Sequence, residues 1–231
     1  MTQYPPQHAQ QYPPLDAIDT LLLDMDGTLL DLRFDNYFWV DHLPDRYGDI
    51  HALDDHMATA HVAASLDAAE GTMDWYCVDH WSRHFSVDIM DLKREIRDLI
   101  CYREGSETFL EQLADLLHLN VVLVTDAHPS VLALKEETLG LTRHVSAVYC
   151  SHDYGVPKRD PRFWQQLEAE LGHDPARTMM IDDSAPVLAQ CASAGIRYQL
   201  MIDQPDSGRT REHDHSFPLI NNLAHLTGSP A

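Results

Sequence analysis

The sequence lacks any apolar run close to the roughly 20 residues that a helix needs to cross a bilayer, so no membrane span is expected. The N-terminal stretch MTQYPPQHAQQYPPLDAID has neither the basic head nor the apolar core of a secretory signal peptide. Cysteine is scarce as well, and the four cysteines form no CxxC pair, which is typical of free thiols in a reducing compartment. Together these absences predict a cytoplasmic protein.

Basic residues are also few, since 16 lysines and arginines stand against 37 aspartates and glutamates, for a formal net charge of -21. A surface of this sign repels a phosphate backbone, so nucleic-acid binding is excluded as the main function. A small anionic substrate remains compatible with the charge. Its site must then overcome the repulsion with a metal ion, a lysine or backbone amides.

Apolar residues make up 44% of the 231 residues, enough for one sizeable core with a smaller second body. The Pro- and Gln-rich residues 1–16 are expected to form a flexible tail outside the fold. From Glu104 onward, strand-like and helix-like segments alternate, which predicts a doubly wound, mostly parallel α/β sheet. The predicted strands are NVVLVTD, SAVYC, TMMIDDS and RYQLMI, and the predicted helices are ETFLEQLADLLHL (residues 107–119), PSVLALKEETLG, PRFWQQLEAELG and APVLAQCASAG.

Residues 33–103 have a different pattern, in which helical periodicity dominates. In IMDLKREIRDLI (residues 89–100), for example, apolar residues recur on one helical face. The buried-strand pattern of TLLLDM, Thr20–Met25, belongs with the later strands. The simplest architecture is an α/β core of residues 17–32 and 104–231, interrupted by a helical cap of residues 33–103. The polar segment after Asp203 is left without an assigned structure.

Acidic, hydroxyl and basic side chains stand where the predicted strands end. Parallel sheets bind ligands beyond the carboxyl ends of their strands, so these side chains are expected to converge on one rim. Taken singly, each has an ordinary explanation as a turn, a helix cap or a surface lysine, but acid pairs at two strand ends are poorly explained by chance. Carboxylates gathered in this way need a cation, and an all-oxygen ligand set suits Mg²⁺. The residues are Asp24, Asp26 and Thr28; Thr125 and Asp126; Lys158; and Asp182 and Asp183.

The motifs DMDGT, VTDA, VPKRDPRFW and MMIDDS resemble, in order, the four motifs of the haloacid dehalogenase-like phosphohydrolase superfamily. The insert after the first motif resembles the helical cap of one subclass. Within the superfamily, stretches such as LLLDMDGTLLDLRFDNYFW and TDAHPSVLALK resemble the enterobacterial purine 5′-nucleotidases, which hydrolyse GMP and IMP. This similarity runs from about Asp16 through Gly208 and therefore includes the cap.

The resemblance implies a phosphatase mechanism. Asp24 is implied as the nucleophile that becomes an aspartyl-phosphate, and a carboxylate ionised at neutral pH suits that step. Asp26 is implied as the acid that protonates the departing 5′ oxygen and then takes a proton from the attacking water. Dehalogenase relatives lack an acid at this position, so a retained Asp26 favours phosphate ester hydrolysis.

The resemblance also implies Mg²⁺ as a cofactor, bound by Asp24, the backbone carbonyl of Asp26 and Asp183, with Asp182 acting through water. Phosphoryl oxygens are assigned to Thr125, Lys158, Asp126 and Thr28. The resembling sequences carry Asn where this chain has Asp126. We expect the side chain of Asp126 to face away from the phosphate, with only its amide at the site.

A nucleotidase must also recognise a base, and aromatic rings in the cap are candidates because they stack on purines. The same rings can instead form the core of the cap. The candidates are Phe38, Trp39, Trp75 and Tyr76, with Asp41, Asp45 or Asp79 as possible acceptors for a purine N–H.

Two other functions remain open from the sequence. One is a phosphatase of the same fold for another small ester, such as phosphoglycolate or a sugar phosphate. The other is a non-catalytic protein that uses the cap as a binding surface. His80 and His84 have the spacing of zinc ligands on a helix but no recognisable third ligand, and His128 is expected to start a helix.

Overall fold

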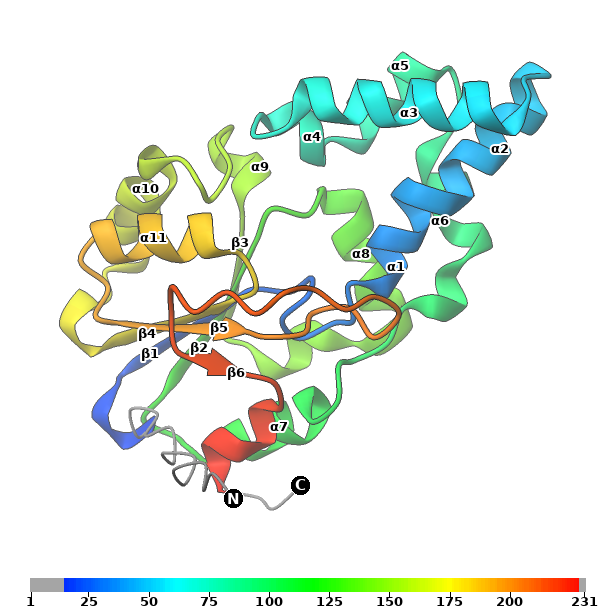
Figure 1. The fold of residues 1–231 in the computed structure, drawn as a ribbon. Coiled ribbons are helices and arrows are strands. Elements are labelled where there is room, and N and C mark those ends of the chain that lie inside the picture. The colour runs from blue at the N-terminus through cyan, green and yellow to red at the C-terminus, as the bar shows by residue number, and fades with distance from the viewer. Residues whose placement is uncertain (1–14, 229–231) are drawn as a thin grey trace, which may run out of the picture.

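The structure, a computed structural model, describes residues 15–228 (Figure 1). Its centre is a six-stranded sheet with the order β3-β2-β1-β4-β5-β6, in which all neighbours run parallel. This is the doubly wound α/β sheet that the sequence predicts. The strands are β1 (Thr20–Leu23), β2 (Asn120–Thr125), β3 (Ala147–Cys150), β4 (Thr178–Asp182), β5 (Tyr198–Ile202) and β6 (Leu219–Ile220).

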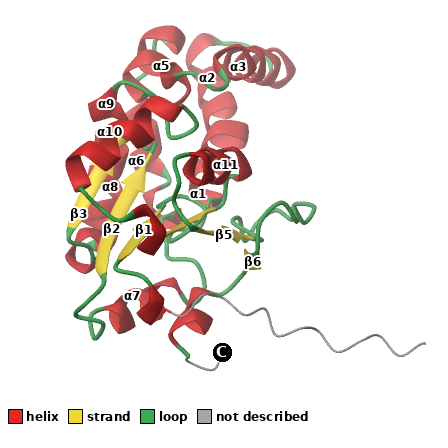
Figure 2. Ribbon diagram, turned by 90° about the vertical axis from the view of Figure 1, so that its left-hand side faces the viewer, coloured by secondary structure: helices red, strands yellow, loops and turns green. Residues whose placement is uncertain are grey.

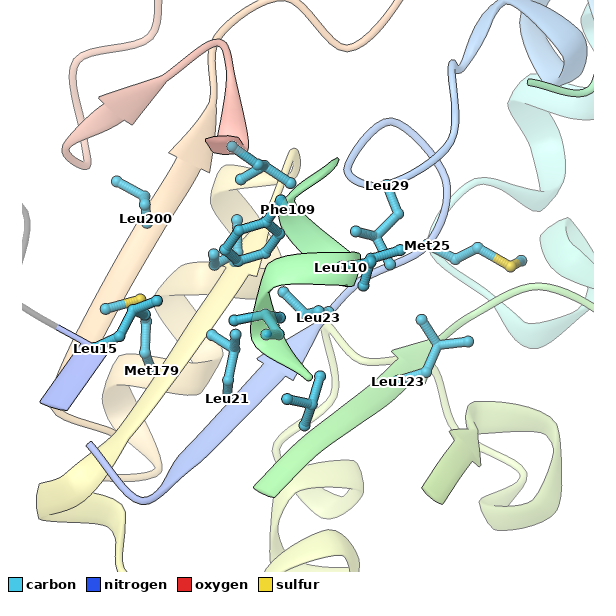
Figure 3. Packing of buried hydrophobic residues seen from close by; sticks show 14 of the residues in the cluster. Leu15, Leu21, Leu23, Met25, Leu29, Phe109, Leu110, Leu123, Met179 and Leu200 are labelled. Atoms are coloured by element: carbon cyan, nitrogen blue, oxygen red, sulfur yellow. The ribbon is translucent and has the colours of Figure 1, made fainter. Parts of the chain in front are cut away.

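Both faces of the sheet are covered, which explains why its central strands are continuously apolar. On one face, Leu21 and Leu23 of β1 pack against Phe109 and Leu110 of α7 (Ser106–Leu113) (Figure 3). On the other face, Leu22 of β1 belongs to a cluster with α10 (Pro161–Leu171) and α11 (Ala185–Ser193). Alternate residues of one short strand thus contribute to two cores.

The chain from α1 to α6, between β1 and α7, forms a group of helices that lies toward the carboxyl ends of the strands (Figures 1 and 2). These helices share a separate apolar core that includes Phe34, Phe38 and Trp81. A π-helical turn, Phe38–His42, joins α1 to α2. The helices are α1 (Arg33–Tyr37), α2 (Leu43–His51), α3 (Asp55–Ala69), α4 (Met73–Tyr76), α5 (Val78–Phe85) and α6 (Ile89–Glu95), followed by a 3-10 turn at Arg97–Leu99.

Two further helices lie between strands of the sheet: α8 (Pro129–Leu139) follows β2, and α9 (Ser151–Tyr154) follows β3. Short 3-10 turns lie at Leu141–His144 and Pro175–Arg177. The helices α8 and α10 end at Gly140 and Gly172, whose φ angles of 63° and 64° form left-handed caps. The four cysteines are free thiols, also as expected.

Several boundaries differ from the sequence-based expectation. The helix expected over residues 107–119 ends at Leu113, and Leu117 is 94% exposed because the chain has already turned toward β2. The helix expected over residues 89–100 stops at Glu95 and continues as the 3-10 turn. The expected tail of residues 1–16 overlaps the fold, since Leu15 is buried in the sheet core; residues 1–14 lie outside the described part of the chain.

The polar segment after Asp203, for which the sequence suggests no structure, closes the edge of the sheet. It contributes β6 and a 3-10 turn at Leu223–Thr227, and it buries Ile220 and Leu223 against α7 and the sheet. Two apolar residues in β6 give too short a pattern to distinguish a strand from a loop. Among residues 15–228, no helix is both long and apolar enough to span a membrane.

Candidate active site

Polar side chains from three adjacent strands meet at the carboxyl edge of the sheet. Asp24 follows β1 directly, while Thr125 ends β2 and Asp182 ends β4, the two strands that flank β1. Lys158 reaches the same edge from the turn between α9 and α10. Each of the four residues is at most 5% exposed. The sheet order therefore brings together residues that the sequence places more than a hundred positions apart.

Lys158 is the centre of this arrangement. Its Nζ lies 2.6 Å from Oδ1 of Asp24 and 2.7 Å from Oδ2 of Asp182, and it donates to the carbonyl of Val124 at 3.2 Å. The backbone is held as well, because the carbonyl of Lys158 accepts from Nε1 of Trp164 at 2.7 Å. Lys158 is thus fixed at both its backbone and its ammonium group.

The carboxylates around Lys158 are unusually easy to protonate. Burial, opposed by Lys158, raises the pKa of Asp24 to about 8, and burial likewise raises the pKa of Asp182 to about 6. Burial and the charge of Asp24 raise the pKa of Asp183 to about 7. Burial lowers the pKa of Lys158, but Asp182 and Asp24 more than compensate, so its pKa lies well above the ordinary value. Negative charge is concentrated here beyond what one lysine neutralises.

Three of these carboxylates have the arrangement of a cation site. One oxygen each from Asp24, Asp182 and Asp183 can be chosen so that all lie within 4.8 Å of one another, and this is the one such group of metal-ligating side chains within residues 15–228. A set of carboxylate oxygens matches the preference of Mg²⁺. The turn at Gly27 packs closely on this group, since a Cβ on Gly27 would stand 2.8 Å from Cγ of Asp183. The donor set therefore fits Mg²⁺.

The carboxylate of Asp26 is directed elsewhere and lies outside that group. Its Oδ1 accepts from Nζ of Lys135 at 2.5 Å, and the same Nζ lies 2.6 Å from Oδ2 of Asp35 in α1. Oδ1 of Asp35 then accepts from Nζ of Lys93 in α6 at 2.9 Å. Burial and the neighbouring Asp35, opposed by Lys135, raise the pKa of Asp26. A buried chain of alternating charges thus extends from Asp26 into the helical insert.

Sequence reasoning missed Lys93, Lys135 and Asp35. A lysine on a helix is usually exposed, yet Lys93 and Lys135 are each 1% exposed. A signal was present in the spacing: Lys135 follows Val131 by four positions, and Lys93 follows Ile89 by four. Each lysine therefore stands on the buried apolar face of its helix.

A cavity of about 310 Å³ connects the carboxylate cluster to the helical insert. At one end it is lined by Asp24, Asp26, Thr125, Asp126 and Lys158, with Asp182 and Asp183. At the other end it is lined by side chains of the insert, among them Asp35, Asn36, Trp39, Trp75, Tyr76, Val78 and Lys93. The cavity therefore has a charged end at the sheet and, at the insert, an end where the rings of Trp39, Trp75 and Tyr76 stand beside the polar side chains of Asp35, Asn36 and Lys93.

Two predicted site residues do not face this cavity. Thr28 is completely buried, its Oγ1 has no hydrogen-bond partner within the described residues, and it does not line the cavity. The turn after Asp26 carries Thr28 inward. The structure therefore does not place its hydroxyl at the cavity, contrary to the prediction that it contacts the phosphate. Phe38 is likewise completely buried in the core of the insert, beside Trp39 at a ring distance of 4.9 Å. The prediction that Phe38 stacks on a base is therefore wrong, because the helix turns Trp39, and not Phe38, toward the cavity.

Asp126 has a structural contact at the rim. Its Oδ1 accepts from the backbone N–H of Lys158 at 2.9 Å, so the carboxylate is engaged by the loop that carries the lysine. The hydroxyl of Thr125 accepts from the backbone N–H of Ala127 at 3.0 Å. The end of β2 and the Lys158 loop are thereby tied together.

Of the remaining candidates, His128 lines the cavity and the others do not. Asp41, Asp45 and Asp79 do not line the cavity, and Asp41 forms an exposed ion pair with Arg209 at 2.7 Å. The rings of His80 and His84 stack at 5.9 Å, and no metal-ligating group within residues 15–228 includes them. His128 caps α8 with Nδ1 accepting from the N–H of Ser130 at 3.2 Å, as expected for a residue that starts a helix.

Comparison with known proteins places this geometry in context. Residues 18–195 match the family described as haloacid dehalogenase-like hydrolase. The chain is 37% identical over 212 residues to the GMP/IMP nucleotidase YrfG of Escherichia coli, a match that covers 92% of this chain and 95% of the relative. A GMP/IMP nucleotidase YrfG of Shigella flexneri matches with the same identity and coverage.

Solved structures share the fold at lower identity. A HAD phosphatase from Thermococcus onnurineus superposes with a TM-score of 0.76 at 19% identity, covering 90% of this chain and 96% of its own. The HAD-hydrolase YfnB from Bacillus subtilis, solved bound to magnesium, superposes with a TM-score of 0.62 at 18% identity, covering 90% and 96%. At these identities, the likeness establishes the fold.

Proposed function

Since the chain belongs to the haloacid dehalogenase-like hydrolase family, we propose that it removes the 5′-phosphate of purine nucleoside monophosphates, GMP and IMP, with Mg²⁺ as cofactor. It is a phosphoric monoester hydrolase, as follows from the family and from the 37% identity to a nucleotidase. The observation that carries the proposed substrate is the extent of that identity: it covers 92% of the chain, so the helices that line the far end of the cavity are included.

The shape of the cavity supports a substrate with a charged end and a flat apolar end. The phosphate belongs at the sheet, where Lys158 and the cation-binding carboxylates lie. The base belongs at the insert, where Trp39, Trp75 and Tyr76 line the cavity. Stacking of a base on an aromatic ring contributes about 1–3 kcal/mol, and it tolerates both guanine and hypoxanthine.

Asp24 is the proposed nucleophile because it lies at the charged end, is buried and is held by Lys158. Its carboxylate oxygen attacks phosphorus, the bond from phosphorus to the 5′ oxygen breaks, and Asp26 gives its proton to that oxygen. Water then attacks the aspartyl-phosphate while Asp26 takes the proton of the water, and the bond from Asp24 to phosphorus breaks. Phosphate leaves and both carboxyl groups return to their starting state.

The positive charge at the site comes from two sources in this proposal. Asp24 and Asp183, with the backbone carbonyl of Asp26 and with Asp182, would hold Mg²⁺, and its charge would offset that of the phosphoryl oxygens. Lys158 holds the orientation of Asp24 and offers its ammonium to a phosphoryl oxygen. The hydroxyl of Thr125, which lines the cavity, donates to another phosphoryl oxygen.

Steady-state hydrolysis of a panel of phosphate esters by the purified protein with Mg²⁺ tests the proposal. The panel contains GMP, IMP, pyrimidine nucleotides, phosphoglycolate and sugar phosphates. The highest kcat/KM is expected for GMP and IMP. A preference for phosphoglycolate or a sugar phosphate overturns the assignment of nucleotides as substrates. If the protein hydrolyses none of the esters, the assignment of catalytic activity is overturned.

A further inference from the structure

Two buried lysines and two partly buried aspartates connect the turn after β1 to the helical insert, and the proposed mechanism uses one of them, Asp26. Lys135 lies between two carboxyl groups, with Nζ at 2.5 Å from Oδ1 of Asp26 and at 2.6 Å from Oδ2 of Asp35. Lys93 takes the other oxygen of Asp35 at 2.9 Å. Each ammonium group therefore contacts carboxyl oxygen, which offsets part of the cost of burying it.

Lys135 does not face the substrate. Its side chain is 2% exposed and it does not line the cavity, whereas the side chain of Asp26 is 22% exposed and does line it. Lys135 therefore acts on the cavity through the two carboxyl groups that it contacts, Asp26 at the charged end and Asp35 at the insert. With Oδ1 of Asp26 engaged by the ammonium group, Oδ2 is the oxygen left to exchange a proton with the leaving group.

The ammonium group of Lys135 is itself held in place. A lysine has a long flexible stem, and a single carboxylate fixes its position weakly. Here Asp35 fixes it from the side opposite Asp26, and Asp35 is in turn fixed by Lys93, whose Nζ stands 4.2 Å from the ring centre of Phe38. The chain of contacts ends in the apolar core of the insert, a rigid support.

We propose that Lys135, anchored by Asp35, is a positioning residue that holds the carboxyl group of Asp26 in the orientation needed to protonate the leaving oxygen. This inference rests on the proposed role of Asp26 as the proton donor. In the step concerned, the bond from phosphorus to the leaving oxygen breaks and the proton moves from Oδ2 of Asp26 to that oxygen. Lys135 keeps its own protons throughout.

The dependence of rate on the leaving group tests the role, because a merely structural lysine would not change it. The 5′ oxygen of GMP needs a proton as it departs, whereas the nitrophenolate of p-nitrophenyl phosphate leaves without one. For Lys135→Met, kcat/KM on GMP is expected to fall about tenfold or more, part of the 10²–10⁴ that general acid catalysis typically supplies. On p-nitrophenyl phosphate, kcat/KM is expected to fall less than about threefold, because departure of the nitrophenolate does not need the positioned proton.

Arg94→Met is the control. Arg94 follows Lys93 in α6, but its side chain is 56% exposed and pairs with Asp91, so the ratio of kcat/KM on GMP to kcat/KM on p-nitrophenyl phosphate should stay at the wild-type value. Asp35→Asn is a second variant that weakens the anchor and leaves Lys135 in place. Asp35→Asn is expected to lower the ratio of activity on GMP to activity on p-nitrophenyl phosphate, but by less than Lys135→Met does. If Lys135→Met fails to fold, Asp35→Asn tests the positioning role in its place.

Asp26→Asn separates failure of this inference from failure of the proposed function. The comparison uses kcat/KM, which reports the departure of the leaving oxygen and not the later attack of water, a step that both esters share. If Asp26→Asn lowers kcat/KM on GMP selectively and Lys135→Met does not, the positioning role is wrong while the proton donor stands. If Asp26→Asn lowers kcat/KM on both esters equally, the proton donor is misassigned and the positioning role falls with it. A selective loss in both variants, absent in Arg94→Met, supports the inference.

Discussion

Lys158 and Asp24 are 134 positions apart in the sequence, and the ammonium Nζ of the lysine lies 2.6 Å from a carboxylate oxygen of the aspartate. Both side chains are buried, so water screens this contact little. The lysine favours the ionised form of Asp24 and fixes its orientation at the end of β1. This pair is therefore the part of the site where a substitution should affect chemistry most directly.

Asp24→Asn is expected to reduce hydrolysis of every ester to background, because an amide oxygen does not replace the carboxylate as a nucleophile. Binding of inorganic phosphate should persist, since Thr125 and Lys158 are unchanged. Steady-state assays and calorimetric titration with phosphate measure the two properties. Asp49→Asn, at a position where the side chain is 74% exposed, is the control and should keep full activity. Substantial turnover by Asp24→Asn would show that the nucleophile lies elsewhere.

Trp39 and Phe38 are adjacent in sequence but differ in environment, so their alanine variants should fail in different ways. Trp39 lines the cavity, and Trp39→Ala is expected to raise KM for GMP about tenfold, equivalent to about 1.4 kcal/mol of lost stacking. Phe38 is in the core of the insert, and Phe38→Ala is expected to lower the free energy of unfolding by about 3–5 kcal/mol.

Steady-state kinetics on GMP and urea denaturation of both variants make the comparison. Glycerol phosphate, which carries no base, serves as the control substrate, and its KM should be the same in Trp39→Ala and the wild type. An equal rise of KM for both esters would remove Trp39 from base recognition.

The fold and the rim were accessible from sequence because both depend on local patterns. Apolar strands that end in acidic pairs, with glycines after the helices, predict a parallel sheet and a shared edge. The positions of Asp24, Lys158 and Asp183 in the structure follow from that sheet order. No long-range information was needed, because parallel strands align their carboxyl ends.

The lysines behind the cavity carboxylates, Lys93 and Lys135, could not be predicted from the sequence in the same way. Lys93 and Lys135 lie on helices whose buried faces meet different partners, and the sequence does not say which helices touch. Thr28 shows the opposite limitation, since its position in a motif suggested an exposed hydroxyl and the turn buries it completely. Local periodicity predicts which face of a helix is buried. It does not predict which side chain of another element packs against that face.

Asp126 offers a test of how the Lys158 loop is held. Asp126→Asn should have little effect on stability, because an amide oxygen can accept from the backbone N–H of Lys158 as the carboxylate does. Asp126→Ala leaves that buried N–H without its acceptor and should lower the free energy of unfolding by about 1–3 kcal/mol. Urea denaturation measures both. Equal stability of the two variants would show that the contact contributes nothing.

Mg²⁺ and pH should act on stability together. Ordinary aspartates titrate near pH 3.9, whereas burial raises the pKa of Asp24 to about 8, of Asp183 to about 7 and of Asp182 to about 6. Between about pH 4 and pH 8, the folded chain without cation therefore binds more protons than the unfolded chain. Its free energy of unfolding then falls as the pH rises.

Mg²⁺ competes with those protons, so it should stabilise the protein more at pH 8 than at pH 6. Saturation at a hundred times the dissociation constant contributes about 2.7 kcal/mol. Thermal unfolding at both pH values, with MgCl₂ or with EDTA, measures the difference in Tm. Asp183→Asn is the control and should lose most of the response. An equal Tm shift at both pH values would contradict the competition.

Gly27 makes the close approach between the turn after Asp26 and the carboxylate of Asp183 possible. Its φ of 81° suits glycine, and a Cβ there would stand 2.8 Å from Cγ of Asp183 and 3.0 Å from Cβ of Pro205. Gly27→Ala is therefore expected both to strain the backbone and to displace Asp183. The affinity for Mg²⁺, measured by calorimetry, should fall about 10–100-fold, as when a residue that supports a metal ligand is changed.

Gly172 separates the two effects, because its φ is 64° and a Cβ there would meet nothing within 4 Å. Gly172→Ala should cost the backbone strain alone, about 1–2 kcal/mol of unfolding free energy, and leave Mg²⁺ affinity unchanged. A selective loss of Mg²⁺ affinity in Gly27→Ala then reports contact with Asp183 and not strain in general. If both variants bind Mg²⁺ as the wild type does, the turn at Gly27 does not position the cation-binding carboxylates.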